Sequence, residues 1–456
     1  MSNLETDRPV LSRRMLLRAG MATLAGYELE SLLRPVNVAA ARKVQPRGAA
    51  ECCIWVFLKG GAPQLDTWDL KEGAWTPGQF EVKRTPGGIL WPYGQFPKLA
   101  QWLPRVAVAR GMETWESAHN RAQYYMQVGH IISPARVREM PAVGSVIAHE
   151  FAGRRKDSDF LPPYVVLNYG NDGLIKEGCL PAGCSPFSMM TQRPSPFLVA
   201  DAERERLNRR WALLRDLEGN SGQQPLEFST HGELSVSARR MMSNPALSKV
   251  MTLPAAERAR YGANAFGDAC LLARQLVAAR AGVKHILLNH DGWDLHAAMY
   301  NPKGRNHYTL CKELDDGLSA LLADLDRTEF ERGSTLLDKT FLLCMGEFGR
   351  TGGPLTVNAG RDHNRYAMCG LFAGAGVIGG QVFGATDERG AKVKSSDWQY
   401  KRSIYPEDVV CTIYSQLGID WTKRITSTPS GRAFEYVEMM SGTNVMKFDP
   451  IGRLFA

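Results

Sequence analysis

The chain has 456 residues, enough for one large domain or two of ordinary size. Hydrophobic residues make up 44% of the sequence and charged residues 22%, a composition typical of a globular protein. The formal net charge is +8, but no long Lys/Arg run occurs. We therefore exclude a nucleic-acid-binding arm and expect no nucleic-acid partner. The charge is interpreted as a mildly basic surface, which is compatible with an anionic substrate but does not by itself indicate one.

The first 41 residues have the order of a secretory signal. The pattern S-R-R-x-L-L at 12–17 contains paired arginines, and an apolar stretch at 19–33 and three alanines at 39–41 follow. The alternative is an amphipathic N-terminal helix. The order of charged, apolar and small residues favours the signal, so we expect export by the twin-arginine machinery to the periplasm or cell surface. The mature domain would cover 42–456, with no transmembrane span.

The remaining sequence alternates between strand-like and helix-like segments. Short apolar runs predict buried strands, and apolar residues at helical spacing predict helices. The expected strands cover 54–58, 106–109, 162–168, 285–289, 341–345, 368–373 and 381–383, and the expected helices cover 117–130, 202–217, 266–281, 308–326 and 407–417. This order predicts an α/β fold with a mostly parallel central sheet flanked by helices. The charged region at about 200–262 is interpreted as a helical insertion.

Candidate metal ligands follow the strand at 341–345. Glu347 comes directly after it, and Asp362 and His363 stand side by side after a Gly-rich loop. Open α/β sheets place their chemistry at the carboxyl ends of strands. Carboxylate oxygens and imidazole nitrogens suit a divalent cation. The alternative is that Glu347 forms an ion pair with Arg350 and that His363 is an ordinary loop residue.

The densest group of candidate ligands is the stretch N-H-D-G-W-D-L-H, which ends at His296. Asp294 and His296 alternate, so in an extended backbone they point the same way and can share a cation. The alternative is that Asp294 caps the next helix. After the first strand, Asp66 and Asp69 are further candidates, and Asp66 is preferred because it lies nearer the strand end.

An anion site is expected at the start of the helix at 117–130. Ser117 or His119 would lie near the helix N-terminus. The helix dipole and the free backbone N–H groups there favour a bound anion.

Five motifs in one order carry a resemblance to a known family. They are the S-R-R leader, G-G-A-P-Q-L-D-T-W-D, H-N-R-A-Q-Y-Y-M-Q-V-G, G-W-D-L-H, and M-G-E-F-G-R-T with G-R-D-H. From about Cys53 to about Asp420, the chain resembles the domain-of-unknown-function family numbered fifteen hundred and one, a family of exported bacterial proteins. That family is grouped with the alkaline phosphatase and sulfatase superfamily. The resemblance implies metal ligands at strand ends and hydrolysis of phosphate or sulfate esters.

The resemblance also assigns roles to individual residues. S-A-H-N-R resembles the sulfatase nucleophile motif, which puts Ser117 at the nucleophile position and Arg121 at the supporting arginine. Glu347 falls at a metal-ligand position, and His363 falls at the last zinc-binding histidine of phosphatases. Asp294 and His296 resemble the ligands of the other zinc site.

Three departures from the superfamily pattern concern the metal sites. Gly60 and Gly61 stand where an Asp usually follows the first strand, and His119 replaces the proline of the nucleophile motif. Phe348 stands where a second-metal ligand is usual. One metal site is therefore expected to be lost or altered.

Together these features predict an exported hydrolase of small anionic phosphate or sulfate esters, with zinc, calcium or magnesium as its cofactor. Ser117 or water would attack, Arg121 or Arg350 would neutralise the anion, and His119 would protonate the leaving group. The alternative is an exported binding or assembly protein that keeps the fold without the chemistry. The expected metal ligands are Asp66, Asp294, His296, Glu347, Asp362 and His363.

Overall fold

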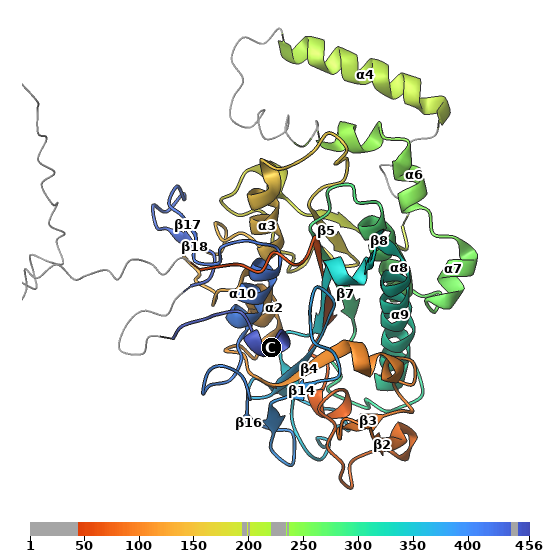
Figure 1. Cartoon of the computed structure of the whole chain (residues 1–456), viewed down its shortest axis with the longest axis vertical. Coiled ribbons are helices and arrows are strands. Elements are labelled where there is room, and N and C mark those ends of the chain that lie inside the picture. The colour runs from red at the N-terminus through yellow and green to blue at the C-terminus, as the bar shows by residue number, and fades with distance from the viewer. Residues whose placement is uncertain (1–43, 194–197, 199–200, 220–233, 235–236, 439–445) are drawn as a thin grey trace, which may run out of the picture. The chain divides into compact units, whose positions relative to one another are not determined.

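The computed structural model describes residues 44–193, 198, 201–219, 234, 237–438 and 446–456. The predicted leader at 1–41 lies outside the described residues. Gln45–Ala456 forms one compact unit. Strands and helices alternate along it, as the α/β prediction requires (Figure 1).

An eight-stranded sheet forms the centre of this unit. Its strands, in spatial order, are β14 (Val382–Phe383), β4 (Val106–Met112), β13 (Met368–Ala373), β10 (Thr340–Met345), β1 (Cys52–Lys59), β7 (His285–Asp291), β5 (Tyr164–Leu167) and β6 (Phe187–Met189). β1 pairs in parallel with β10 and β7, while β13 runs antiparallel to β10 and to β4. The remaining pairs in this sheet are parallel, so the predicted, mostly parallel sheet is confirmed.

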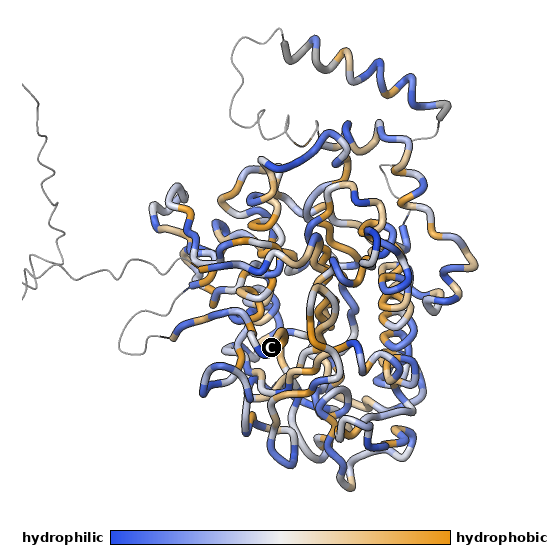
Figure 2. Tube along the Cα trace, in the orientation of Figure 1, coloured by the Kyte–Doolittle hydropathy of each residue, from blue (hydrophilic) through white to orange (hydrophobic). Residues whose placement is uncertain are grey.

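Helices cover both faces of the sheet. Figure 1 shows α8 (Ala265–Ala278) and α9 (His307–Arg327) on one side, and α2 (His119–Val128), α3 (Val143–Ala152) and α10 (Pro406–Gln416) on the other. Because both faces are covered, β1 is buried from Cys52 to Leu58. Figure 2 shows hydrophobic residues concentrated along the central strands and hydrophilic residues along the outer loops.

Most predicted elements are present, with shifts at their ends. The helix predicted at 117–130 begins at His119 and ends before Gly129, which adopts a left-handed conformation with φ +72°. α3 was not predicted. The helices α4 (Asp201–Gly219), α6 (Ala246–Met251) and α7 (Ala255–Arg260) lie in the region interpreted as an insertion. The short strands β2 (Val82–Arg84), β3 (Leu90–Pro92), β8 (Glu329–Glu331), β9 (Ser334–Thr335), β11 (Gly349–Arg350), β12 (His363–Asn364), β15 (Ala385–Thr386), β16 (Val393–Ser395), β17 (Arg424–Ile425) and β18 (Phe434–Glu435) form two-stranded sheets.

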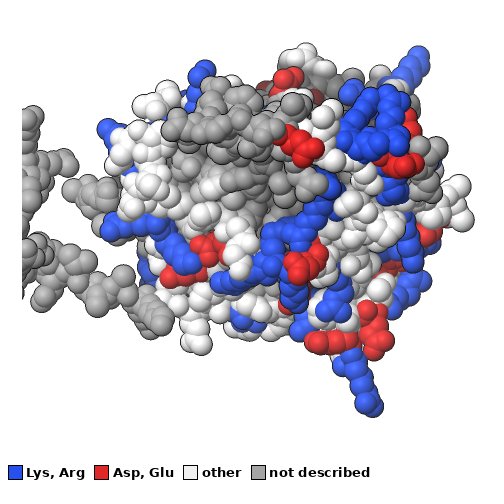
Figure 3. Space-filling model, turned by 90° about the horizontal axis from the view of Figure 1, so that it is seen from above, with Lys and Arg blue, Asp and Glu red and all other residues white. Residues whose placement is uncertain are grey.

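The surface carries both signs of charge. On the face seen in Figure 3, Lys and Arg side chains are widespread and Asp and Glu side chains lie among them. Among the described residues, no helix is both long enough and apolar enough to cross a bilayer.

A buried polar contact joins α2 to α10. The Tyr125 hydroxyl on α2 donates a hydrogen bond to Oε2 of Glu407, in the first turn of α10. Burial raises the pKa of Glu407 to about 8, although the Tyr125 hydrogen bond acts in the opposite direction. This hydrogen bond therefore helps to hold α2, whose first residue is His119, against α10.

The raised pKa of Glu407 predicts a pH-dependent stability. Between an unfolded-state pKa of 4.5 and a folded-state pKa of about 8, the folded chain keeps a proton that the unfolded chain has released. The free energy of unfolding should therefore fall as pH rises through this window. Glu407→Gln should remove this part of the decline, as measured by denaturant unfolding at several pH values. An identical pH profile for both proteins would contradict the assignment.

Candidate metal centre

The candidate site lies at the carboxyl edge of the central sheet. β4 and β7 end at this edge, and the segments that follow them carry His119, Asp294 and His296. β13 runs antiparallel to its neighbours, so its amino end lies at the same edge. The segment before β13 brings His363 there. Residues from three separate parts of the chain thus meet at one end of the sheet.

Among the described residues, four side chains form one group that could hold a metal ion. One ligand atom each from His119, Asp294, His296 and His363 lies within 4.8 Å of the others. Oδ1 of Asp294 is 3.0 Å from Nε2 of His119 and 2.9 Å from Nε2 of His296. It is 3.6 Å from Nε2 of His363. One carboxylate oxygen and three imidazole nitrogens therefore converge.

Each histidine in the group has an outer partner at Nδ1. The outer atoms are Oε1 of Glu347 for His119 at 2.8 Å and Oδ1 of Asp362 for His296 at 2.9 Å. For His363 the partner is the backbone carbonyl of Ser117 at 2.6 Å. A carbonyl oxygen accepts hydrogen bonds and cannot donate, so Nδ1 of His363 carries the proton and its Nε2 presents a lone pair to the centre. Outer acceptors of this kind orient metal-binding histidines.

The inner nitrogen atoms lie close enough to share a proton or a metal ion. Nε2 of His296 and Nε2 of His363 are 2.9 Å apart. Two lone pairs at that distance repel each other unless a proton or a metal cation lies between them. Nε2 of His119 is buried and has no hydrogen bond of acceptable geometry among the described residues. An unpartnered buried nitrogen that faces a carboxylate fits a metal ligand.

The charges around Asp294 keep it ionised. Burial by itself would raise its pKa, but the hydrogen bond from Arg350 and the charge of His119 outweigh burial and lower the pKa to about 2. Burial lowers the pKa of His363, and the charges of Arg350 and of protonated His119 lower it further. His363 is therefore neutral near neutral pH, as a metal ligand must be. Burial alone would lower the pKa of His119 as well, but the contacts with Glu347 and Asp294 outweigh burial and raise it, so a metal ion would displace a proton from His119.

The donor set restricts the metal. Three imidazole nitrogens and one carboxylate oxygen suit zinc and other first-row divalent ions. Calcium and magnesium prefer an all-oxygen shell. Of the three metals considered from the sequence, zinc fits these residues best.

Glu347 lies one layer behind the group. Its carboxylate is fully buried and accepts hydrogen bonds from the backbone N–H of Gly60 at 2.9 and 3.1 Å and from Nε2 of Gln123 at 3.2 Å. The predicted ligand thus orients His119, which is itself in the group. Gly60 has φ +107°, and a Cβ there would lie 2.5 Å from the backbone nitrogen of Asp294. Only glycine allows this approach.

Asp66 is not among the four grouped residues. Its carboxylate pairs with Arg361, with Oδ2 2.6 Å from Nε and Oδ1 3.2 Å from Nη2, and both side chains are buried. Arg361 also donates to the carbonyls of Thr351 and Gly353. The pair thus holds the loop before Asp362, which in turn contacts His296. Asp69, the second candidate, lies 3.0 Å from Nζ of Lys71.

Arg350 organises the loops around the site. Its guanidinium donates to the carbonyls of Gly60, Gly61 and Arg361 and, at 2.7 Å, to Oδ1 of Asp294. A further contact of 3.4 Å reaches Nε2 of His296. These five contacts match the five N–H groups of an arginine. Arg350 therefore has no free N–H with which to bind an anion, the role predicted for it from the sequence.

The two remaining predicted residues, Arg121 and Ser117, are not among the four grouped residues. The Arg121 guanidinium pairs with Glu116 at 2.7 and 2.8 Å. Ser117 is exposed, and its carbonyl is the outer acceptor for His363. Gln123 and Arg361 were not assigned a role from the sequence. The spacing of Gln123, four residues after His119 on the same helix face, was the available signal.

The family described as "Protein of unknown function (DUF1501)" matches residues 50–448. The chain belongs to this family. The membership predicted from the five motifs is therefore confirmed. A comparison with curated proteins found no match.

Several solved structures are similar to the chain at low identity. A protein in the alkaline phosphatase superfamily from Vibrio parahaemolyticus is 11% identical, with a TM-score of 0.38 and coverage of 82% of this chain and 69% of that chain. The PsFucS1 sulfatase from Pseudoalteromonas sp. is 12% identical, with a TM-score of 0.37 and coverage of 90% and 72%. The zinc complex of the C-terminal periplasmic domain of EcEptC from Escherichia coli is 10% identical, with a TM-score of 0.34 and coverage of 83% and 84%. Likeness at this level does not extend to substrate or mechanism.

The contact between His119 and Glu347 predicts that substitution of Glu347 lowers zinc affinity more than substitution of Glu116 does. Glu347→Gln should weaken zinc affinity about 10- to 100-fold, because substitution of the residue that holds a ligating histidine from behind has an effect of that size. Glu116→Gln is the matched control, since Glu116 pairs with Arg121 just before the same helix. Competition with a chromogenic chelator measures both affinities. Equal affinities in the two variants would contradict the role of Glu347.

Proposed function

We propose that the chain is an exported hydrolase of phosphate or sulfate esters that uses one divalent transition-metal ion. The observation that carries this proposal is the convergence of three imidazole nitrogens on one oxygen of Asp294. Each imidazole is held from behind by a fixed acceptor, which supports a site built for a cation. When bound, such an ion polarises an ester oxygen and stabilises the charge that develops in the transition state.

The charge and exposure of the ligands suit an anionic substrate. Asp294 supplies the one negative charge among the four residues, so the ligands themselves leave one charge of a divalent cation uncompensated, and Arg350 offsets one of the two outer carboxylates, Glu347 and Asp362. The side chains of Asp294 and His296 are 46% and 43% exposed. The open side of the site is therefore accessible to a small ester.

The contacts of Glu347 favour one metal ion over two. Its carboxylate oxygens already accept hydrogen bonds from Gly60, His119 and Gln123. The Phe348 ring lies beside the site, with its centroid 4.8 Å from that of His119 and 4.6 Å from that of His363. In this arrangement the Glu347 carboxylate orients His119, and the Phe348 ring has no atom that can bind a metal ion. These contacts support the expectation that one metal site is lost or altered.

The attacking group is Ser117 or water. Ser117 is exposed, and its carbonyl contact with His363 keeps its backbone next to the ligand group. His119 acts as a ligand in this proposal and not as the proton donor considered from the sequence. Its Nδ1 contact to Glu347 and its Nε2 contact to Asp294 use both ring nitrogens.

Export by the twin-arginine route remains part of the proposal. It rests on the S-R-R-x-L-L leader, which lies outside the described residues. This route carries folded proteins, so a metal acquired on folding would travel with the chain to the periplasm or cell surface.

A second candidate function is an exported binding or assembly protein that keeps the fold. The observation that favours it is the pairing of both candidate anion-binding arginines. Arg350 donates to four loop acceptors, and Arg121 pairs with Glu116. Arg350 therefore has no N–H left for an ester, and Arg121 would bind one only with the N–H groups that Glu116 does not accept.

Turnover of aryl esters separates the two functions. The zinc-loaded full chain should hydrolyse para-nitrophenyl phosphate or para-nitrophenyl sulfate. Asp294→Asn should lower kcat/KM by about 100-fold or more, because it removes the only charged ligand. Ser117→Ala should abolish turnover if serine attacks and leave most of it if water attacks. No turnover of either ester above the level of Asp294→Asn would contradict the hydrolase and favour the binding protein.

A further inference from the structure

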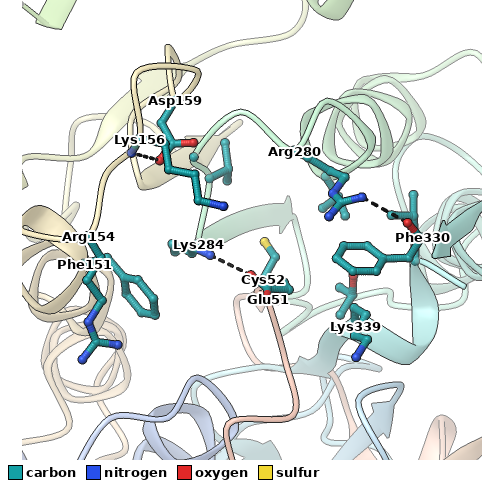
Figure 4. A pocket seen from close by; sticks show the side chains of 15 residues that line it. Glu51, Cys52, Phe151, Arg154, Lys156, Asp159, Arg280, Lys284, Phe330 and Lys339 are labelled. Atoms are coloured by element: carbon teal, nitrogen blue, oxygen red, sulfur yellow. Dashed lines mark hydrogen bonds and ion pairs between the residues drawn. The ribbon is translucent and has the colours of Figure 1, made fainter. Parts of the chain in front are cut away.

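A second pocket lies at the amino edge of the sheet, where the parallel strands β1, β7 and β10 begin. Its cavity has a volume of about 250 Å³ and reaches Cys52 and Thr340, the first residues of β1 and β10. The metal-ligand group lies at the other end of these strands. Figure 4 shows this amino-edge pocket from close by.

The lining of the amino-edge pocket is strongly basic. Five cationic side chains line it: Arg154, Lys156, Arg280, Lys284 and Lys339. The acidic residues of the lining are Glu51 and Asp159, so the lining carries three net positive charges. Such a concave basic surface concentrates anions.

Three of these cations have no carboxylate partner. Among the described residues, the Lys156 ammonium and the guanidinium groups of Arg154 and Arg280 form no ion pair. Lys284 pairs with Glu51 at 3.0 Å, and Lys339 pairs with Glu331 at 3.3 Å. Figure 4 shows the Lys156 side chain extending toward the middle of the pocket. This ammonium group is therefore available to a ligand.

Aromatic rings form opposite walls of the pocket. The Arg280 guanidinium lies 3.9 Å from the centroid of Phe330, and Nζ of Lys284 lies 4.9 Å from that of Phe151. Nη1 of Arg280 also donates to the Phe330 carbonyl at 3.0 Å. Cations fixed against apolar rings attract an anion more strongly than cations surrounded by water do. The rings also offer apolar surface to the body of a ligand.

The floor of the pocket contains an unpartnered hydroxyl. Thr340 lines the pocket and is fully buried, and its Oγ1 has no hydrogen-bond partner among the described residues. A buried polar atom without a partner is costly. An oxygen of an anion bound against it would accept a hydrogen bond from this hydroxyl.

We propose that the amino-edge pocket binds a small organic dianion with an apolar body, of the arylphosphonate or aryl phosphate class. The anionic oxygens would contact Lys156 and Thr340, and the apolar body would lie between Phe151 and Phe330. This site is separate from the metal centre and does not depend on the proposed hydrolysis.

The test is calorimetric titration of the full, metal-free chain with phenylphosphonate, which carries no hydrolysable ester. Lys156→Ala should weaken binding about tenfold or more, the loss expected for one charge-assisted hydrogen bond. Thr340→Val keeps the side-chain shape and should also weaken binding. Lys394→Ala, an exposed lysine on β16, is the matched control and should bind as the unaltered chain does. His363→Ala should also leave binding unchanged.

Three results would overturn the proposal. The first is no binding by the unaltered chain. The second is binding that survives Lys156→Ala but is lost in His363→Ala, which would place the anion at the metal centre. The third is equal affinity for inorganic phosphate and phenylphosphonate, which would show that the phenyl ring makes no favourable contact in the pocket. Lys156 is exposed, so its substitution does not endanger the fold.

Discussion

The candidate site depends on one carboxylate oxygen, Oδ1 of Asp294. Three imidazole nitrogens face it, and Arg350 donates to it at 2.7 Å. Because the same arginine donates to the carbonyls of Gly60, Gly61 and Arg361, a single buried side chain links the segment after β1, the segment after β7 and the loop before β12. Buried charges are stable only when paired and fully hydrogen-bonded, so these segments must keep their relative positions.

The direction of the strands explains why distant residues meet. Parallel strands bring the segments after β4 and β7 to one edge, and the antiparallel β13 brings the segment before it to the same edge. The outer layer then sets the histidine rings: Glu347, Asp362 and the Ser117 carbonyl each hold one Nδ1. The opposite edge of the sheet carries a basic pocket that shares none of these residues. One sheet thus presents two chemically different ends.

The sequence alone predicted the fold class and named several residues that the structure brings together in the candidate site. Buried strands and glycine boundaries are local signals, and candidate ligands at strand ends follow from sheet topology, so Asp294, His296 and His363 could be named. The outer layer could not be assigned, because it depends on contacts across the chain. In the sequence Glu347 and Asp66 are candidate ligands. In the structure Glu347 accepts hydrogen bonds from Gly60 and Gln123, and Asp66 pairs with Arg361. His119 lies in the group because α2 packs with its first residue at the carboxyl edge of the sheet, and no local sequence pattern predicts that position.

The central claim is that these four residues hold one metal ion. Elemental analysis by mass spectrometry of the full chain, purified without chelating resin, tests it most directly. We expect about one equivalent of zinc or a similar divalent ion. We expect this metal to be lost in His363→Ala and in His119→Ala, because removing one of four ligands weakens such a site severely. A folded chain without metal, or one that keeps its metal in both variants, would contradict the account.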